Sequence, residues 1–234
     1  MSIDKARLAR SVRQVPFYLI VGLILLYLIF PIYWMLITSF RPPGRLFAVE
    51  YWPAEINLIN YRFLTINQDL LYGLYNSIII SLAVLILTLS IGACAAYALG
   101  RLKFRGQRTI YFGILALTAF PTISIVGGLY LLVTNPCVIF GGTCQQFQLY
   151  NTRTALVITY LILTLPLTIW FLTNYYRQLP VDLEDAAYVD GATPFQTFTY
   201  IFLPLSAPAL MTTGLLAFII SWGEFLFALT FTID

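Results

Sequence analysis

Residues able to do chemistry are scarce in this 234-residue sequence, which contains no histidine. Histidine is the commonest general base and a frequent transition-metal ligand. Without it there is no Ser/His pair and no His-Glu zinc motif, so we expect no catalytic residue and no metal site. Glu224 is the only ionisable residue in the long apolar stretches, and Trp222 lies close before it. We expect Glu224 either to contact a polar solute or to fix helix packing through a hydrogen bond.

Cysteines offer one further possibility. Cys137 and Cys144 lie in one short loop, on either side of the pair Gly141-Gly142. A disulfide between them would form in an oxidising compartment, and two free thiols are the alternative. Without histidine the pair makes a poor metal site. Cys94 lies in an apolar stretch and is expected to act as a small packing residue.

The acidic segment 179–204, LPVDLEDAAYVDGATPFQTFTYIFLP, carries the strongest local signals in the chain. Asp182 is expected to cap a short helix, with Asp185 at the capping-box position. Helical spacing then places four residues on one face: Leu183, Ala186, Ala187 and Asp190. A face of small residues edged by acids suits insertion into a groove of a partner, and a solvated loop is the alternative.

A glycine elbow is predicted within the same segment. Gly191 is a natural helix end, and Thr193 followed by Pro194 is typical of the start of a second helix. The pattern therefore predicts two short helices, one on each side of Gly191.

The composition predicts an all-α membrane protein. Hydrophobic residues make up 60% of the chain and charged residues 10%, against about 25% charged residues in soluble domains. This composition excludes a soluble enzyme and a disordered chain, and the dispersed basic residues argue against a nucleic-acid partner. A helix of about 20 apolar residues crosses a bilayer. Five stretches meet this condition: 16–38, 76–99, 109–133, 154–173 and 206–230.

Basic residues predict the orientation of these spans. Four precede the first span and four follow the second: Lys5, Arg7, Arg10 and Arg13, then Arg101, Lys103, Arg105 and Arg108. Because Lys and Arg concentrate in cytoplasmic loops, the N-terminus and the segment 179–204 are expected in the cytoplasm. The loops 39–75 and 134–153 are expected outside. The first span is expected to remain as an anchor, because its apolar run is too long for a signal peptide.

Prolines and small residues mark expected features of individual spans. Pro31, Pro121 and Pro166 are expected to interrupt helices, either as simple kinks or beside a cavity. Gly92, Ala96 and Gly100 recur at every fourth position, which favours close helix packing.

The spacing in 179–204 resembles the coupling motif of ABC importer permeases. That motif is Glu-Ala-Ala, three residues, Gly, nine residues, and Ile-x-Leu-Pro. Here Asp185 replaces the leading Glu, with Glu184 beside it, and Gly191 falls at the glycine position. Stretches including Asn76-Ser77 and Trp222-Gly223-Glu224-Phe225 resemble the carbohydrate (maltose-type) branch over nearly the whole chain, although Gly223 replaces a common Asn.

The resemblance implies a single permease domain over 1–234, a helical bundle of the type I kind. The family has a sixth helix after the fifth, which this sequence does not include. The substrate-path candidates are Glu224 and Trp222. The resemblance also implies the residues that couple to an ATPase: Glu184, Asp185, Ala186, Ala187, Asp190, Gly191, Ile201, Leu203 and Pro204.

The implied function is a permease subunit of an ATP-driven importer in the bacterial inner membrane. Its cargo would be a sugar, oligosaccharide, glycosylated osmolyte or polyol. The implied partners are two ABC ATPase subunits, a second homologous permease and an extracytoplasmic solute-binding protein. ATP and Mg would bind the ATPase, and no cofactor would bind this chain.

Energy coupling separates the two classes of transporter that we consider. The two lysines, Lys5 and Lys103, do not follow glycine, so the chain has no Gly-Lys-Ser/Thr phosphate loop and is not expected to be an enzyme. The alternative is an ion-coupled secondary transporter of small solutes. Such proteins need intramembrane carboxylates or histidines, of which this chain has only Glu224.

Overall fold

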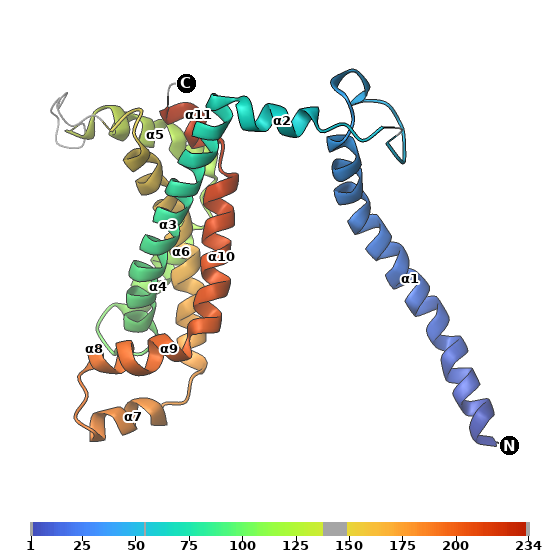
Figure 1. The fold of residues 1–234 in the computed structure, drawn as a ribbon. Coiled ribbons are helices and arrows are strands. Elements are labelled where there is room, and N and C mark those ends of the chain that lie inside the picture. Colours follow the sequence, from blue (N-terminus) through green and yellow to red (C-terminus); the bar gives the residue numbers. More distant parts are fainter. Residues whose placement is uncertain (1, 54, 138–148, 233–234) are drawn as a thin grey trace. The chain divides into compact units, whose positions relative to one another are not determined.

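The computed structural model describes residues 2–53, 55–137 and 149–232, with side chains from residue 14 onward, and these ranges contain helices and no strands (Figure 1). The predicted all-α fold is therefore confirmed. The chain divides into two compact units, Met1–Gly73 and Leu74–Asp234, and each is described by itself. The prediction of one permease domain over 1–234 stays a prediction.

The first unit contains α1 (Ser2–Ser39), the short 3-10 helix η1 (Pro43–Arg45) and α2 (Ile59–Ile66). The part of α1 from Gln14 to Ser39 is long and apolar enough to cross a membrane, as predicted. Pro31 lies inside this helix and does not interrupt it. Membrane helices tolerate such prolines where neighbouring groups or local adjustments satisfy the freed backbone carbonyl.

Arg41 organises the loop that follows α1. Its side chain is only 1% exposed, and it donates hydrogen bonds to the carbonyls of Ala48, at 2.6 Å, and Glu50. The guanidinium lies over the Trp34 ring, 4.9 Å from its centroid. The Asn60 amide donates to the Arg41 carbonyl at 2.7 Å, so this one residue connects α1, the loop and α2.

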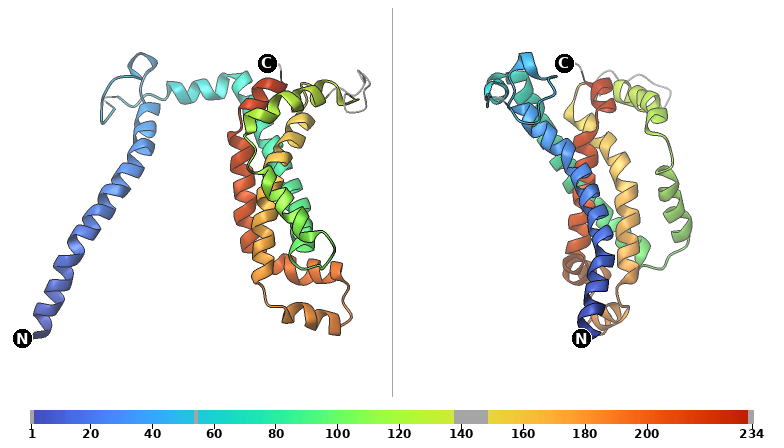
Figure 2. Two further views of the ribbon diagram at one scale, coloured as in Figure 1. Left: turned by 180° about the vertical axis from the view of Figure 1, so that it is seen from behind. Right: turned by 90° about the vertical axis from the view of Figure 1, so that its right-hand side faces the viewer.

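The second unit is a bundle of helices with a bent segment at one end (Figure 2). α3 begins in the first unit's range and continues into this one. The helices are α3 (Gln68–Gly100), α4 (Gln107–Leu117), α5 (Thr122–Thr134), α6 (Arg153–Gln178), α7 (Asp182–Val189), α8 (Pro194–Thr197), the π-helix η4 (Phe198–Phe202), α9 (Leu203–Leu205), α10 (Ala207–Gly223) and α11 (Leu226–Phe231).

Small residues let α3, α6 and α10 approach closely. A Cβ on Gly92 of α3 would lie 2.9 Å from Cγ2 of Thr168 on α6, and one on Gly214 of α10 would lie 3.0 Å from a Leu85 methyl. Thr88 and Thr164 share a buried hydrogen bond of 2.8 Å between α3 and α6. The predicted packing role of the small-residue stripe in α3 is thereby supported.

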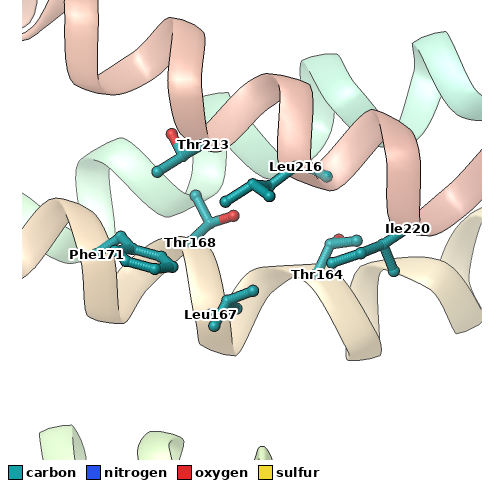
Figure 3. A pocket seen from close by; sticks show the side chains of 8 residues that line it. Thr164, Leu167, Thr168, Phe171, Thr213, Leu216 and Ile220 are labelled. Carbon is teal, nitrogen blue, oxygen red and sulfur yellow. The ribbon is translucent and has the colours of Figure 1, made fainter. Parts of the chain in front are cut away.

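The seam between α6 and α10 is lined by threonine and apolar side chains. Figure 3 shows Thr164 and Thr168 on α6 facing Thr213 and Leu216 on α10. These side chains are short enough for the two helices to lie side by side along most of α10, and contacts between α6 and α10 are the most extensive in the unit.

The third predicted span, 109–133, is not one helix. α4 and α5 are bent by 98° at a break that contains Pro121, whereas α6 continues through Pro166. Proline lacks the N–H that an unbroken helix needs and clashes with the preceding turn. Pro121 therefore interrupts its span as predicted. Pro166 does not end its helix, and its side chain lines a pocket, which agrees with the predicted position beside a cavity.

The fifth predicted span, 206–230, also differs from one continuous helix. α10 ends at Gly223, Glu224 adopts an extended conformation, and α11 begins at Leu226. At its other end α10 follows the segment Pro194–Leu205 through a bend of 77°. The structure thus has three continuous helices able to cross a membrane in its described residues, or up to five spans when each bent pair is one span.

Substituting Gly92 tests the close approach of α3 and α6. We expect Gly92→Val to destabilise the protein by about 1–3 kcal/mol, because a side chain forced into a packed interface displaces its neighbours. Gly113→Val in α4 is the matched control, since a Cβ there meets nothing within 4 Å. Thermal unfolding of both variants in detergent measures the difference, and equal stability would contradict the packing.

Candidate functional site

The segment between α6 and α10 forms a compact unit at one end of the bundle. α7, α8, η4 and α9 lie at this end, with α5 and α11 at the opposite end (Figures 1 and 2). The two predicted short helices with a glycine between them are therefore present as α7 and α8.

The predicted cap of α7 is wrong. The residue before the helix is Val181, which makes no side-chain cap, and Asp182 is the first helical residue. Asp182, Glu184 and Asp185 all lie in the first turn. Negative side chains at this position stabilise a helix through its dipole, so the acids act through charge and not through capping.

Gly191 ends α7 in the conformation that the elbow requires. Its φ is +78°, which glycine adopts more readily than other residues. Its N–H donates to the Tyr188 carbonyl at 3.1 Å, and the Ala192 N–H donates to the Ala187 carbonyl at 2.9 Å. This pair of bonds is the Schellman motif, which satisfies two carbonyls at the end of the helix.

Thr193 starts the second helix as predicted. Its hydroxyl accepts from the Gln196 N–H at 3.3 Å, and the Gln196 side-chain oxygen accepts from the Thr193 N–H at 2.8 Å. Pro194 occupies the first helical position. The capping box fixes where the chain turns after Gly191, and it therefore fixes the angle of α8.

Burial separates residues that the sequence placed together. Glu184 and Ala187 are buried, at 8% and 4% exposed, whereas Asp185, Ala186 and Asp190 are exposed. The predicted shared face of α7 is therefore wrong for Ala187, which packs inward. Of the two neighbouring acids Glu184 and Asp185, only Asp185 has an exposed carboxylate.

Arg101 explains the burial of Glu184. It is the first residue after α3, and its Nε lies 3.9 Å from Oε2 of Glu184. Its guanidinium donates to the Leu179 carbonyl at 2.7 Å and to the Pro180 carbonyl at 3.1 Å. It also lies over the Phe202 ring at 4.8 Å. One side chain thus joins α3 to the start of α7 and to η4.

Aromatic packing next to Arg101 adds to this anchorage. The Tyr97 ring lies 5.1 Å from Phe198 and 5.2 Å from Phe202, and Tyr176 of α6 completes the buried cluster. The Tyr176 hydroxyl is 3.3 Å from the Ser206 hydroxyl, at the start of α10. Movement of α8 and η4 therefore requires movement of α3, α6 and α10.

The outer surface of the segment is partly apolar. Val189 is 87% exposed and Phe195 is 71% exposed, on either side of the Gly191 elbow. Tyr188 donates a hydrogen bond to Glu184 at 3.2 Å. Partial desolvation and the Glu184 carboxylate raise the pKa of Tyr188.

Three members of the motif lie beyond the elbow. Ile201, Leu203 and Pro204 fall in η4 and α9. Ile201 and Leu203 pack against the buried cluster around Tyr97, whereas Pro204 is exposed. These residues position the segment against the bundle, and the exposed residues near Gly191 are left to make external contacts.

Glu224 lies at the break between α10 and α11, in the half of the unit opposite to α7. Its two carboxylate oxygens accept from the Phe227 N–H at 3.0 and 3.2 Å, and the Tyr160 hydroxyl lies beside it. The carboxylate therefore starts α11 and faces α6. This geometry supports the alternative in which Glu224 fixes helix packing through a hydrogen bond. A contact between Glu224 and a solute stays a prediction.

Trp222 and the bend between α4 and α5 lie elsewhere in the same unit. The Trp222 ring stacks on Phe218 with centroids 5.6 Å apart, and Trp222 is 43% exposed. A pocket of about 470 Å³ lies at the bend between α4 and α5 and is lined by residues including Thr118, Thr122 and Pro166. Glu224 and Trp222 are not among its lining residues.

The match to a known family decides the class of this protein. Residues 89–233 match the family described as the binding-protein-dependent transport system inner membrane component. The chain belongs to this family. The matched range includes the Gly191 elbow, Arg101 and Glu224, and the membership does not favour the alternative of an ion-coupled secondary transporter.

Relatives of this inner-membrane component support the assignment. It is 40% identical to the trehalose/maltose transport system permease protein MalG of Thermococcus litoralis, over 92% of this chain and 75% of that one. It is 34% identical to the trehalose transport system permease protein SugB of Mycobacterium tuberculosis, over 88% and 71%. The sulfoquinovosyl glycerol transport system permease protein SmoH of Agrobacterium fabrum is 33% identical, over 87% and 68%.

A solved structure shares the fold. It is the crystal structure of a bacterial ABC transporter involved in the import of the acidic polysaccharide alginate. One of its chains superposes with a TM-score of 0.78, covering 97% of this chain and 76% of that one at 20% identity. The predicted type I permease fold is therefore confirmed.

Two further predictions concern cysteines and metals. Cys94 is a free cysteine and Cys137 takes part in a disulfide, whereas Cys144 lies in 138–148, outside the described residues. The pairing of Cys137 with Cys144 therefore stays a prediction. Among the described residues, no three histidine, cysteine or acidic side chains gather where they could hold a metal ion.

Arg101 was used in the sequence analysis only to predict the orientation of the spans, and its contact with Glu184 was not predicted. No local pattern could identify its partner, because α4, α5 and α6 separate Arg101 from Glu184 along the chain. An arginine directly after an apolar span, with no neighbouring acid, was the available hint.

Two substitutions of Glu224 distinguish the hydrogen bond that its side chain accepts from the effect of its negative charge. Glu224→Gln keeps an acceptor oxygen for the Phe227 N–H, whereas Glu224→Ala removes it and is expected to cost about 1 kcal/mol, as for a lost helix cap. Thermal stability should therefore fall for Ala and not for Gln, with exposed Asp69→Asn as the control. Equal stability of both Glu224 variants would contradict the capping role.

Proposed function

We propose that this inner-membrane component is a permease subunit of an ATP-driven importer for a sugar, oligosaccharide, glycosylated osmolyte or polyol. The coupling to an ATPase rests on one observation: the surface around the Gly191 elbow is exposed, and Arg101 connects this segment to the bundle. The cargo class rests on the names of relatives that transport trehalose, maltose and sulfoquinovosyl glycerol.

The α7–α8 surface has the properties of a docking site for an ATPase subunit. Asp185 and Asp190 present charge at its edge, and Val189 and Phe195 present apolar area. Aromatic and aliphatic anchors inside a polar rim are typical of protein interfaces. The ATPase would bind ATP and Mg, and this chain would bind no cofactor and contain no ATPase site of its own.

The remaining partners follow from the family. The family is described as binding-protein-dependent, and such a binding protein would deliver cargo at the outer surface. We further propose two ATPase subunits and a second homologous permease that completes the pathway. Glu224 and Trp222 are the residues of this chain proposed to face that pathway.

The proposed topology places the N-terminus and α7–α9 in the cytoplasm of a bacterial cell. The basic residues in the first turns of α1 and those that directly follow α3 support it, because Lys and Arg concentrate on the cytoplasmic side. The loops 39–75 and 134–153 would then lie outside, where the cysteine pair is in an oxidising compartment.

Closure of the ATPases on ATP would move α7 and α8 as one body. Because Arg101 holds the start of α7 and η4 against the end of α3, that movement would reach the membrane helices directly. The result would be rigid-body exchange between inward-open and outward-open states, with ATP favouring the outward-open state and hydrolysis resetting it.

Purification of the tagged, full-length chain from native membranes in mild detergent tests the function. We expect a phosphate-loop ATPase and a second permease to co-purify and the complex to hydrolyse ATP. Ligand screening of the co-expressed binding protein would then identify the cargo. Intact chain without any ATPase would overturn the proposal, and a binding protein that takes only non-sugar ligands would overturn the cargo class.

Arg101→Gln tests the transmission of movement. It removes the charge beside Glu184 and the hydrogen bonds to the Leu179 and Pro180 carbonyls. Loss of even one of these charge-assisted bonds costs about 1.5 kcal/mol, which corresponds to roughly tenfold in an equilibrium constant. We expect the ratio of solute imported to ATP hydrolysed to fall by about this factor. Uptake and ATPase activity are measured together in proteoliposomes, with the assembled complex quantified for each variant.

The matched control for this experiment is Arg105→Gln. Arg105 is exposed and lies in the same connection between α3 and α4, so the variant removes the same charge without touching α7. A normal transport-to-ATP ratio in Arg101→Gln, or an equal loss in Arg105→Gln, would contradict the proposed role of Arg101.

A further inference from the structure

A basic pocket lies where α4 begins and α6 ends. Its volume is about 260 Å³, and its lining residues are Gln107, Arg108, Tyr111, Phe112 and Arg177. Two of these five residues are arginines and none is acidic. We propose that this pocket binds the phosphate of an acidic phospholipid headgroup, with both guanidinium groups as donors.

Arg177 is held in place before any ligand arrives. Its guanidinium lies over the Tyr111 ring at 4.6 Å and donates to the Leu99 carbonyl at 3.1 Å. The Gln107 amide donates to the same carbonyl at 2.6 Å. The buried Tyr111 is fixed in turn by Asn174, at 3.3 Å from its hydroxyl. A ligand therefore meets a preformed wall, which lowers the entropic cost of binding.

Both arginines retain unused charge and donors. In the part of the chain that the structure describes, neither Arg108 nor Arg177 forms an ion pair, and the ion pair there joins Arg101 to Glu184. Arg108 lies over the Phe112 ring at 5.6 Å, a contact that leaves its N–H groups available. Guanidinium groups bind phosphate oxygens through paired, charge-assisted hydrogen bonds.

The position of the pocket favours a lipid over free phosphate. Arg177 lies in the last turn of the membrane-spanning α6, and Gln107 begins the bent pair α4–α5, so the pocket lies where both helices leave the apolar layer. Ile110 and Phe112 are 48% and 51% exposed beside it. A phospholipid uses both surfaces, since basic pockets at the ends of membrane helices bind headgroups and exposed apolar side chains contact acyl chains.

This inference requires only the membrane location of the helices and is independent of ATPase coupling. The experiment uses the assembled transporter, delipidated and titrated with phosphatidylglycerol, and native mass spectrometry counts the lipid bound per complex. Arg108→Gln is expected to lower the apparent affinity roughly fivefold, and Arg108→Gln with Arg177→Gln roughly 25-fold. Arg108→Gln serves as the variant least able to disturb folding, since Arg108 is exposed and lies over the ring of its helical neighbour Phe112.

The control pair is Lys103→Gln with Arg105→Gln, which removes equal charge from exposed residues that do not line the pocket. We expect this pair to retain bound phosphatidylglycerol, and we expect neither phosphatidylcholine nor inorganic phosphate to displace it. If both double variants lost bound phosphatidylglycerol equally, general surface charge would explain the binding and the proposed site would be overturned. Displacement by inorganic phosphate would overturn the lipid assignment, and loss of a partner subunit without loss of lipid would make the pocket a protein interface.

Discussion

The guanidinium of Arg101 joins the membrane bundle to the segment that protrudes from it. Hydrogen bonds to two carbonyls before α7, the charge of Glu184 and the ring of Phe202 converge on this one group. The Arg101 side chain is only 6% exposed, and its charge must be compensated on several sides because desolvation of an unpaired charge is costly. The orientation of α7 relative to α3 is therefore set by the compensation of one buried charge.

The segment itself combines a tightly packed inner side with an exposed outer side. The Schellman motif at Gly191 and the capping box at Thr193 satisfy the backbone at both helix ends. The inner side packs on Tyr97 and Phe202, so local backbone geometry and tertiary packing support the same arrangement. The outer side, with Asp185 among its exposed residues, is not covered by the rest of the described chain.

The membrane bundle meets a different constraint. Between helices in lipid there is little hydrophobic driving force, so close van der Waals packing must hold them together. Gly92 and Gly214 allow that approach, and the Thr88–Thr164 hydrogen bond adds a polar contact in the interior. The two breaks, at Pro121 and before α11, depart from straight spans, and at the second break a glutamate satisfies a backbone N–H.

The sequence alone determined the helical membrane class, the family motif, the Gly191 elbow and the Thr193 cap, because hydropathy, spacing and turn chemistry are local properties. Tertiary structure decided what local patterns could not. Glu184 and Asp185 are adjacent and chemically alike, yet a distant arginine turns one inward and leaves the other exposed. Likewise, Pro121 breaks its span and Pro166 does not, since the cost of a proline depends on the neighbours that satisfy the freed carbonyl.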